Sequence, residues 1–266
     1  MSRDRRNART TARPARFVTL LLLASLLAGH HALAAKPELT VAIPSDIPPY
    51  VMKKGTTGIE VDIVQRVLAG YTVHFIQMPY KELQTAVPQN GVDVAVSVKQ
   101  FGDDGVFYSE DFVTFENFAI TKKAAGLKID SVADLANHKV LAWQDASLEL
   151  GPEFKRFFSP ESPQRKNYVE VDDQREQVRM FWQAKADIIV IDRSIFSYFS
   201  AETGHSTSEV AFHSLFPSVT NFKVGFKDAA VRDAFNRGLT RLCQSGDYAK
   251  LLKRYHVELP RTVCDH

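Results

Sequence analysis

The chain has 266 residues, of which 45% are hydrophobic and 24% are charged, and its formal net charge is +2. The basic excess lies in residues 1–34, which hold six arginines and one acid; without them, 33 basic and 31 acidic residues become 27 and 30, a net charge of about −3. A nucleic-acid partner would require a basic face, so we expect no nucleic-acid binding. The remaining length suits one large domain or two small lobes.

Residues 1–34 have the three parts of a secretory signal peptide. The arginines precede an uninterrupted apolar run at 17–28, and Ala32-Leu33-Ala34 is a cleavage site of the A-x-A type. The alternative is an uncleaved N-terminal anchor, but the apolar run is shorter than the roughly 20 residues that span a membrane. We therefore expect cleavage after Ala34 and a periplasmic location.

After this segment, strand and helix patterns alternate. Residues 39–43 and 92–96 are short apolar runs typical of buried strands, and 71–78 alternates as a half-buried strand does. Residues 59–68 and 81–87 have the apolar spacing of helices. Strand–helix–strand units of this length predict parallel strands with helices on both faces.

A second set of elements follows the polar stretch at 121–128. It comprises predicted strands at 139–143, 168–171, 188–191 and 221–226, and predicted helices from Ser147, at 174–183 and, as a closing pair, within 228–255. The pattern therefore predicts an α/β protein with two units, each a mixed, mostly parallel sheet flanked by helices. We expect the chain to cross between the units twice, near 118–121 and 216–221.

The chain has two cysteines, Cys243 and Cys264. In an oxidising compartment such a pair forms a disulfide more often than a metal or redox site, so we expect a bond that ties the C-terminal tail to a late helix. The sequence has no phosphate-binding glycine loop, no nucleophile elbow, no H-E-x-x-H and no paired C-x-x-C, and its histidines are scattered. We therefore expect no cofactor, no metal and no catalytic residue.

Several segments resemble, in order, the motifs of one family. They are Pro48-Pro49-Tyr50 with Gly58-Ile59-Glu60-Val61-Asp62, Gly91-Val92-Asp93-Val94, Tyr108-Ser109-Glu110-Asp111-Phe112, Ile129-Asp130-Ser131-Val132-Ala133-Asp134-Leu135, Ala186-Asp187-Ile188 with Asp192, and Gly246-Asp247-Tyr248. These are similar to the opening turn, the two G-x-V-D strands, the F-S-x-P-Y and I-x-S-L-A-D-L segments and the closing helices of bacterial solute-binding proteins of family 3, the polar amino-acid type. The chain is identified as a divergent member of that family.

The resemblance implies the type II-like fold of periplasmic binding proteins, with two lobes that close by hinge bending around a small polar solute. The expected limits are 35–119 for the first lobe, 120–217 for the second, and 218–266 for a return to the first. The implied function is to bind an amino acid, an amine or a related compound in the cleft and to deliver it to a membrane permease of the ABC type. We expect a monomer that is not an enzyme.

Ligand sites in open α/β sheets lie at the carboxyl ends of strands, which selects candidates in each lobe. In the first lobe, Tyr50 and Tyr80 follow strands, and their rings could stack on a ligand or only pack. Ser97 ends the strand at 92–96, and Gln100 matches a position where the family often has Ser or Thr.

In the second lobe, Gln144 and Ser147 follow the strand at 139–143. Ser147 and free backbone N–H groups could hold a carboxylate, or Ser147 could be only a helix cap. Asp192, at the end of an apolar strand, matches the family acid that pairs with a ligand amino group; an internal salt bridge is the alternative.

One segment departs from the family pattern. Members carry S-I-T-x-x-R, whose arginine binds the ligand carboxylate through two hydrogen bonds. Here the corresponding segment, residues 97–105, is shorter than in the family and contains no arginine. Lys99 could supply a charge, without the planar fork of a guanidinium. The ligand either lacks a carboxylate, as an amine does, or holds it through Ser147 and backbone groups.

Two other functions remain open at this point. One is ligand sensing for a receptor or an associated oxidoreductase, which would use the same cleft. The other is an enzyme similar to cyclohexadienyl dehydratases, which resemble this family and need a general acid, here Glu149 or Asp46.

Overall fold

The computed structural model describes residues 35–89, 91–100, 102–217 and 219–265. The predicted signal peptide, with its cleavage site, lies outside these residues. The chain divides into two units, residues 1–35 and 36–266, and the fold described here is that of the second. Within the described ranges, no helix is long and apolar enough to cross a membrane.

The first sheet has the strand order β2-β1-β3-β11-β4, and β5 also pairs with β11. Its strands are β1 (Glu38–Pro44), β2 (Thr72–Met78), β3 (Val94–Val98), β4 (Phe107–Tyr108), β5 (Val113–Phe115) and β11 (Thr220–Phe226). Strand β1 is parallel to β2 and β3, whereas β11 runs antiparallel to β3, β4 and β5. The sheet is therefore parallel on one side and antiparallel on the other.

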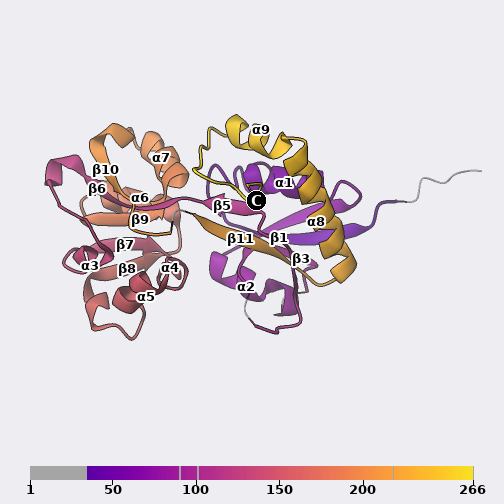
Figure 1. The fold of residues 1–266 in the computed structure, drawn as a ribbon, viewed down its shortest axis with the longest axis horizontal. Helices are drawn as coiled ribbons and strands as arrows, with labels where there is room; N and C mark the ends of the chain where they lie inside the picture. Colours follow the sequence, from indigo (N-terminus) through magenta and orange to yellow (C-terminus); the bar gives the residue numbers. More distant parts are fainter. Residues whose placement is uncertain (1–34, 90, 101, 218, 266) are drawn as a thin grey trace, which may run out of the picture. The chain divides into compact units, whose positions relative to one another are not determined.

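Among the described residues, four helices cover the two faces of this sheet (Figure 1). They are α1 (Ile59–Val67), α2 (Tyr80–Gln89), α8 (Ala229–Gln244) and α9 (Asp247–Arg254). Val41 and Val94 belong to the core formed with α1, α8 and α9, whereas Ala42 and Ala95 pack with α2. Neighbouring residues of a strand point to opposite faces, so the stretches 41–43 and 94–96, which are buried on both faces, are apolar.

The second sheet has the order β10-β6-β9-β7-β8. Its strands are β6 (Asn117–Lys122), β7 (Val140–Trp143), β8 (Tyr168–Val171), β9 (Ile188–Asp192) and β10 (Val210–His213). The helices are α3 (Val132–Leu135), α4 (Ala146–Glu149), α5 (Pro152–Phe158), α6 (Gln174–Trp182) and α7 (Arg193–Glu202), with 3-10 turns η1 (Lys123–Ala125), η2 (Pro163–Asn167) and η3 (Thr207–Glu209). Strand β7 is parallel to β8 and β9, and β6 is antiparallel to β9 and β10.

The predicted α/β fold class is confirmed, and most predicted elements lie within a few residues of the observed ones. The sequence patterns did not predict β4, β5, β6 and β10, which run antiparallel to their neighbours. Each sheet is therefore less parallel than we expected. The first crossing between the two sheets lies slightly earlier than the expected 118–121. Strand β6 already pairs with β9 from Asn117 onward, so the chain leaves the first sheet at Glu116.

Two local features constrain the chain around the first sheet. Gly58 has a φ of +126°, and a Cβ atom there would lie 2.3 Å from the carbonyl oxygen of Tyr50, so another residue would clash. The predicted disulfide between Cys243 and Cys264 is confirmed, and it joins the end of α8 to the C-terminal tail. Closing a loop of this length stabilises the fold by about 3 kcal/mol.

Candidate functional site

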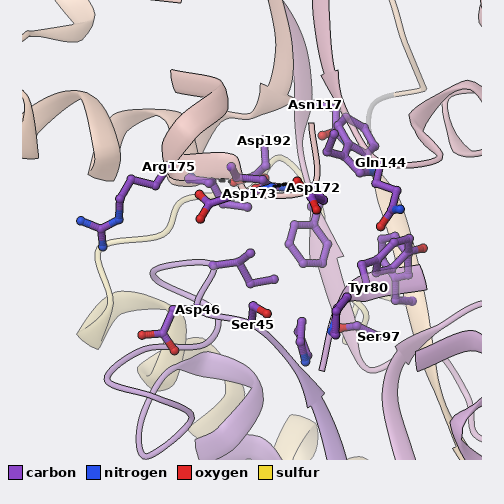
Figure 2. A pocket seen from close by; sticks show the side chains of 18 residues that line it. Ser45, Asp46, Tyr80, Ser97, Asn117, Gln144, Asp172, Asp173, Arg175 and Asp192 are labelled. Carbon is purple, nitrogen blue, oxygen red and sulfur yellow. Dashed lines mark hydrogen bonds between the residues drawn. The ribbon is translucent and has the colours of Figure 1, made fainter. Parts of the chain in front are cut away.

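A cavity of about 370 Å³ lies where the parallel strands of both sheets end. Its lining comprises Pro44, Ser45, Asp46, Ile47, Pro79, Tyr80, Ser97, Phe115 and Phe222 from the first sheet and its loops, and Asn117, Trp143, Gln144, Asp172, Asp173, Gln174, Arg175, Asp192 and Ile195 from the second. Figure 2 shows the two sets facing each other, with Asp46, Ser45, Tyr80 and Ser97 opposite Asp172, Asp173 and Asp192. The carboxyl ends of strands are where α/β folds bind ligands.

Three aromatic rings, those of Tyr80, Phe115 and Phe222, line the first-sheet side of this cleft. The ring of Phe222 stands edge-on to Tyr80, with centroids 6.2 Å apart, and edge-on to Phe115, at 5.3 Å. The Tyr50 ring lies 4.1 Å behind Phe115. Tyr50 is fully buried and does not line the cavity.

A buried carboxyl lies beneath the same side. The hydroxyl of Ser97 donates to Glu60 Oε1 at 2.8 Å, and Glu60 Oε2 has no hydrogen-bond partner. Ser97 has a φ of +56°, a conformation that costs a residue with a side chain about 1 kcal/mol or more. Burial raises the pKa of Glu60 to about 7, which the Ser97 hydrogen bond opposes.

On the second-sheet side, Asp192 is the best-satisfied carboxylate. Its Oδ1 accepts the backbone N–H groups of Ser194 and Ile195, so Asp192 is the N-cap of α7. Its Oδ2 accepts the N–H of Glu116 at 2.8 Å and the Tyr50 hydroxyl at 3.3 Å. Burial raises the pKa of Asp192 to about 6 although all four hydrogen bonds favour the ionised form.

The loop between β8 and α6 brings two more carboxylates to the cleft. Asp173 caps α6 by accepting the N–H of Glu176, and Asp172 accepts the N–H of Asp173. Arg175 also belongs to the lining, but its guanidinium pairs with Glu202 at 2.7 Å, and in Figure 2 it extends away from the other labelled side chains.

One ion pair joins the two sides. Lys99 follows β3. Its Nζ atom lies 3.2 Å from Glu149 Oε2 of α4 and 4.1 Å from the centroid of the Phe222 ring. It also donates to the carbonyl of Asn221 at 2.7 Å. Burial raises the pKa of Glu149, and Lys99 opposes that shift. Lys99 is therefore occupied by protein groups.

The family is decided by comparison of the sequence with known families. Residues 39–258 match the sequence model of the bacterial extracellular solute-binding proteins, family 3. The chain belongs to this family. A comparison with curated proteins finds no match.

Solved structures show the same fold as this family 3 protein at low sequence identity. A mutant of the T. maritima protein ArgBP has a TM-score of 0.66 and 18% identity, covering 83% of this chain and 96% of that one. An amino acid transporter substrate-binding protein from Streptococcus pneumoniae, bound to L-arginine, gives 0.65 and 18%, covering 83% and 94%. A histidine kinase sensor domain gives 0.68 and 16%, covering 82% and 95%.

The structure separates the predicted site residues of this solute-binding protein into two groups. Tyr80, Ser97, Gln144 and Asp192 line the cleft. The other three, Tyr50, Gln100 and Ser147, are not among its lining residues.

Ser147 was a candidate for holding a ligand carboxylate, but a carboxylate of the protein is already there. Its hydroxyl donates to Glu170 Oε1, and the N–H of Asp145 donates to Glu170 Oε2, both at 3.3 Å. Tyr168 and Arg165 also contact Glu170. Ser147 is buried behind the cleft surface.

Sequence reasoning missed several lining residues. Phe115 and Phe222 lie on strands whose pairing is antiparallel, Asp172 and Asp173 lie in the loop between β8 and α6, and Gln174 and Arg175 begin α6. The signal that could have found residues 172–175 is position, because they follow the carboxyl end of a predicted parallel strand.

Three buried polar atoms of lining residues have no hydrogen-bond partner. They are the Tyr80 hydroxyl and the Oε1 atoms of Gln144 and Gln174. Buried polar groups are normally paired, so unpaired ones at a cleft are free to contact a ligand or water. Within the described residues, no group of three His, Cys, Asp or Glu side chains could hold a metal ion.

Proposed function

We propose that this protein binds a small polar solute, an amino acid, an amine or a related compound, in the cleft and delivers it to an ABC permease. The observation that carries the proposal is the cavity at the carboxyl ends of β1, β2 and β3 on one side and β7, β8 and β9 on the other. Its volume, about 370 Å³, suits a solute of that size. Family membership supports the same function.

We propose that the two sheets and their helices form two lobes that close on the solute. The chain crosses between the sheets twice, at Glu116 and between His213 and Thr220, close to the predicted lobe limits at 119 and 217. Asn117 Nδ2 donates to Thr220 Oγ1 at 3.2 Å and joins the two crossings. Two adjacent crossings of this kind suit hinge bending.

In this proposal, Tyr80, Ser97, Gln144 and Asp192 contact the solute. Tyr50 and Ser147 support the site from behind, since Tyr50 holds Asp192 and Ser147 holds Glu170. Asp192 already accepts four hydrogen bonds, so its contribution to binding is its negative charge and not an additional hydrogen bond. We propose that the protein acts in the periplasm, as a monomer, after cleavage of its signal peptide.

The acids considered for an enzyme are engaged by protein groups. Glu149 is paired with Lys99, and Asp46 accepts the N–H groups of Lys54 and Gly55 and the amide of Gln77. A general acid must reach its substrate with a proton to give. We therefore propose binding without catalysis.

Thermal unfolding of the purified protein against a panel of amino acids, amines and small organic acids tests the proposal. A ligand at a hundredfold excess over its Kd stabilises the folded protein by about 2.7 kcal/mol. We expect one chemical class to raise the unfolding temperature, a smaller rise in Gln144→Ala, and an unchanged rise in Asn137→Ala, an exposed amide of the same lobe. No rise with any compound would contradict the proposal.

Delivery is tested separately. In cells from which the gene has been deleted, uptake of the radiolabelled ligand should fall and should recover when the gene is restored. Binding with undiminished uptake would point to sensing instead of transport.

A further inference from the structure

Most of the charged side chains that line the cleft are negative. Four lining residues carry carboxylates, Asp46, Asp172, Asp173 and Asp192. Among the described residues, Arg175 is the only lysine or arginine in the lining, and it pairs with Glu202. Lys99 lies nearby and is held by Glu149 and the Asn221 carbonyl. An anionic group of a ligand would therefore meet negative charge without a free cation.

On the second-sheet side, several backbone donors that could have bound a ligand carboxylate are taken by the protein. Helix N-termini present free N–H groups that bind anions. On the second-sheet side, Asp192 occupies those of α7, Asp173 occupies one at α6, and Glu170 takes the N–H of Asp145 before α4. A carboxylate that entered the cleft would lose water without gaining these hydrogen bonds, which is unfavourable.

The remaining features suit a cation that carries N–H groups. The rings of Tyr80, Phe115, Trp143 and Phe222 line the cleft, and aromatic faces attract organic cations. The unpartnered Oε1 atoms of Gln144 and Gln174 are acceptors. A ligand with N–H donors satisfies these oxygens, whereas a fully methylated ammonium cannot.

We infer that the cleft takes a small organic cation with N–H donors, an amine or a guanidine, that lacks a carboxylate. This inference rests on the proposed function and narrows its ligand class. Discrimination comes from repulsion as well as attraction, since the lining carboxylates disfavour an anionic group at the place where the amine binds.

The test is calorimetric titration of the protein with matched compounds. Each set contains an amino acid and the amine that lacks its carboxylate: arginine and agmatine, lysine and cadaverine, ornithine and putrescine, histidine and histamine, tyrosine and tyramine. We expect the amine of at least one set to bind at least tenfold more tightly than its amino acid, which corresponds to about 1.4 kcal/mol.

The outcomes separate the two proposals. Binding with an amine advantage below tenfold in every set overturns the inference and leaves the proposed function standing. No binding by any compound contradicts the proposed function, and the inference falls with it.

A pair of variants tests the source of the preference. Asp172→Asn removes a lining carboxylate that caps no helix, and Asp130→Asn removes an exposed carboxylate outside the lining. We expect Asp172→Asn to weaken amine binding by about two- to fivefold, the range for an exposed ion pair, and Asp130→Asn to leave it unchanged. Equal affinities in both variants would overturn the role given to the lining carboxylates.

Discussion

A buried carboxyl lies on each side of the cleft, and the two carboxyls differ in the number of hydrogen bonds that they receive. Glu60, beneath the aromatic side, receives one hydrogen bond, from Ser97, and its other oxygen has no partner. Asp192, on the opposite side, receives four. Burial raises both pKa values, to about 7 for Glu60 and about 6 for Asp192.

This difference shows what each carboxyl does for the fold. The four donors of Asp192 come from the start of α7, from Glu116 at the first crossing and from Tyr50 of the first sheet, so Asp192 joins three segments. Glu60 joins only α1 to β3 through Ser97. Asp192 therefore holds more segments in place than Glu60 does, although burial makes the charged form of both carboxyls cost stability.

Replacing Asp192 should have the largest effect. Asp192→Ala removes the cap of α7, leaves the N–H of Glu116 without this acceptor and leaves the Tyr50 hydroxyl with only the Thr114 carbonyl, so we expect the free energy of unfolding to fall by about 3 kcal/mol. Asp192→Asn keeps one oxygen for the helix and should lose less. Urea unfolding measures both, and an Asp192→Ala variant as stable as the parent would refute this account.

Glu60→Gln should raise the free energy of unfolding, and the size of this increase should depend on pH. The pKa of Glu60 is about 7 in the folded protein and about 4.3 in an unfolded chain, so the folded chain binds more protons between these values. The free energy of unfolding therefore falls as pH rises through that window, by about 3 kcal/mol from this group.

In the Glu60→Gln variant this loss should disappear, leaving the smaller slope of the same sign from Asp192. Urea unfolding at about pH 5 and about pH 8 compares the parent, this variant and Glu161→Gln, which changes an exposed carboxyl. A parent whose stability rises between these pH values, with the same rise in Glu60→Gln, would contradict the role of Glu60.

The ion pair across the cleft should have a moderate effect. Lys99 and Glu149 side chains are 23% and 9% exposed, so a double-mutant cycle with Lys99→Met and Glu149→Gln should give a coupling energy of about 1 kcal/mol. The exposed pair Arg156 and Glu153 is the control, with an expected coupling near zero. Equal couplings would show that Lys99 and Glu149 do not hold the two sides together.

The smallest effect is expected at Arg175. Its pairing with Glu202 is exposed, so Arg175→Gln should change the free energy of unfolding by less than about 1 kcal/mol. It should also leave ligand affinity unchanged or slightly raise it, because the ligand would be a cation. A large loss of affinity on calorimetric titration would show that this guanidinium turns toward the ligand.

The parallel strands and their helices were predictable because each is a local pattern. The buried runs at 92–96 and 188–191 correspond to β3 and β9, and the spacing at 59–68 corresponds to α1. Strands β5 and β6 were missed because they flank Glu116, where the chain changes sheets, and no period extends across that point.

Four of the seven proposed ligand residues line the cleft because the carboxyl ends of parallel strands can be located from sequence. The position of Tyr50 could not be predicted because a turn residue can face either the cleft or the core, and here it packs behind Phe115. The partners of Asp192 could not be predicted, since two of them lie 76 and 142 residues away.

The sequence by itself determined the family, the two α/β units, the disulfide pair and the lack of an arginine after β3, because these depend on local patterns and residue identity. Only the tertiary structure decided which charges remain free. Lys99, Ser147 and Asp192 were candidates for contact with a ligand, yet folding pairs each of them with a distant group. The charge presented by the cleft is what remains after that pairing.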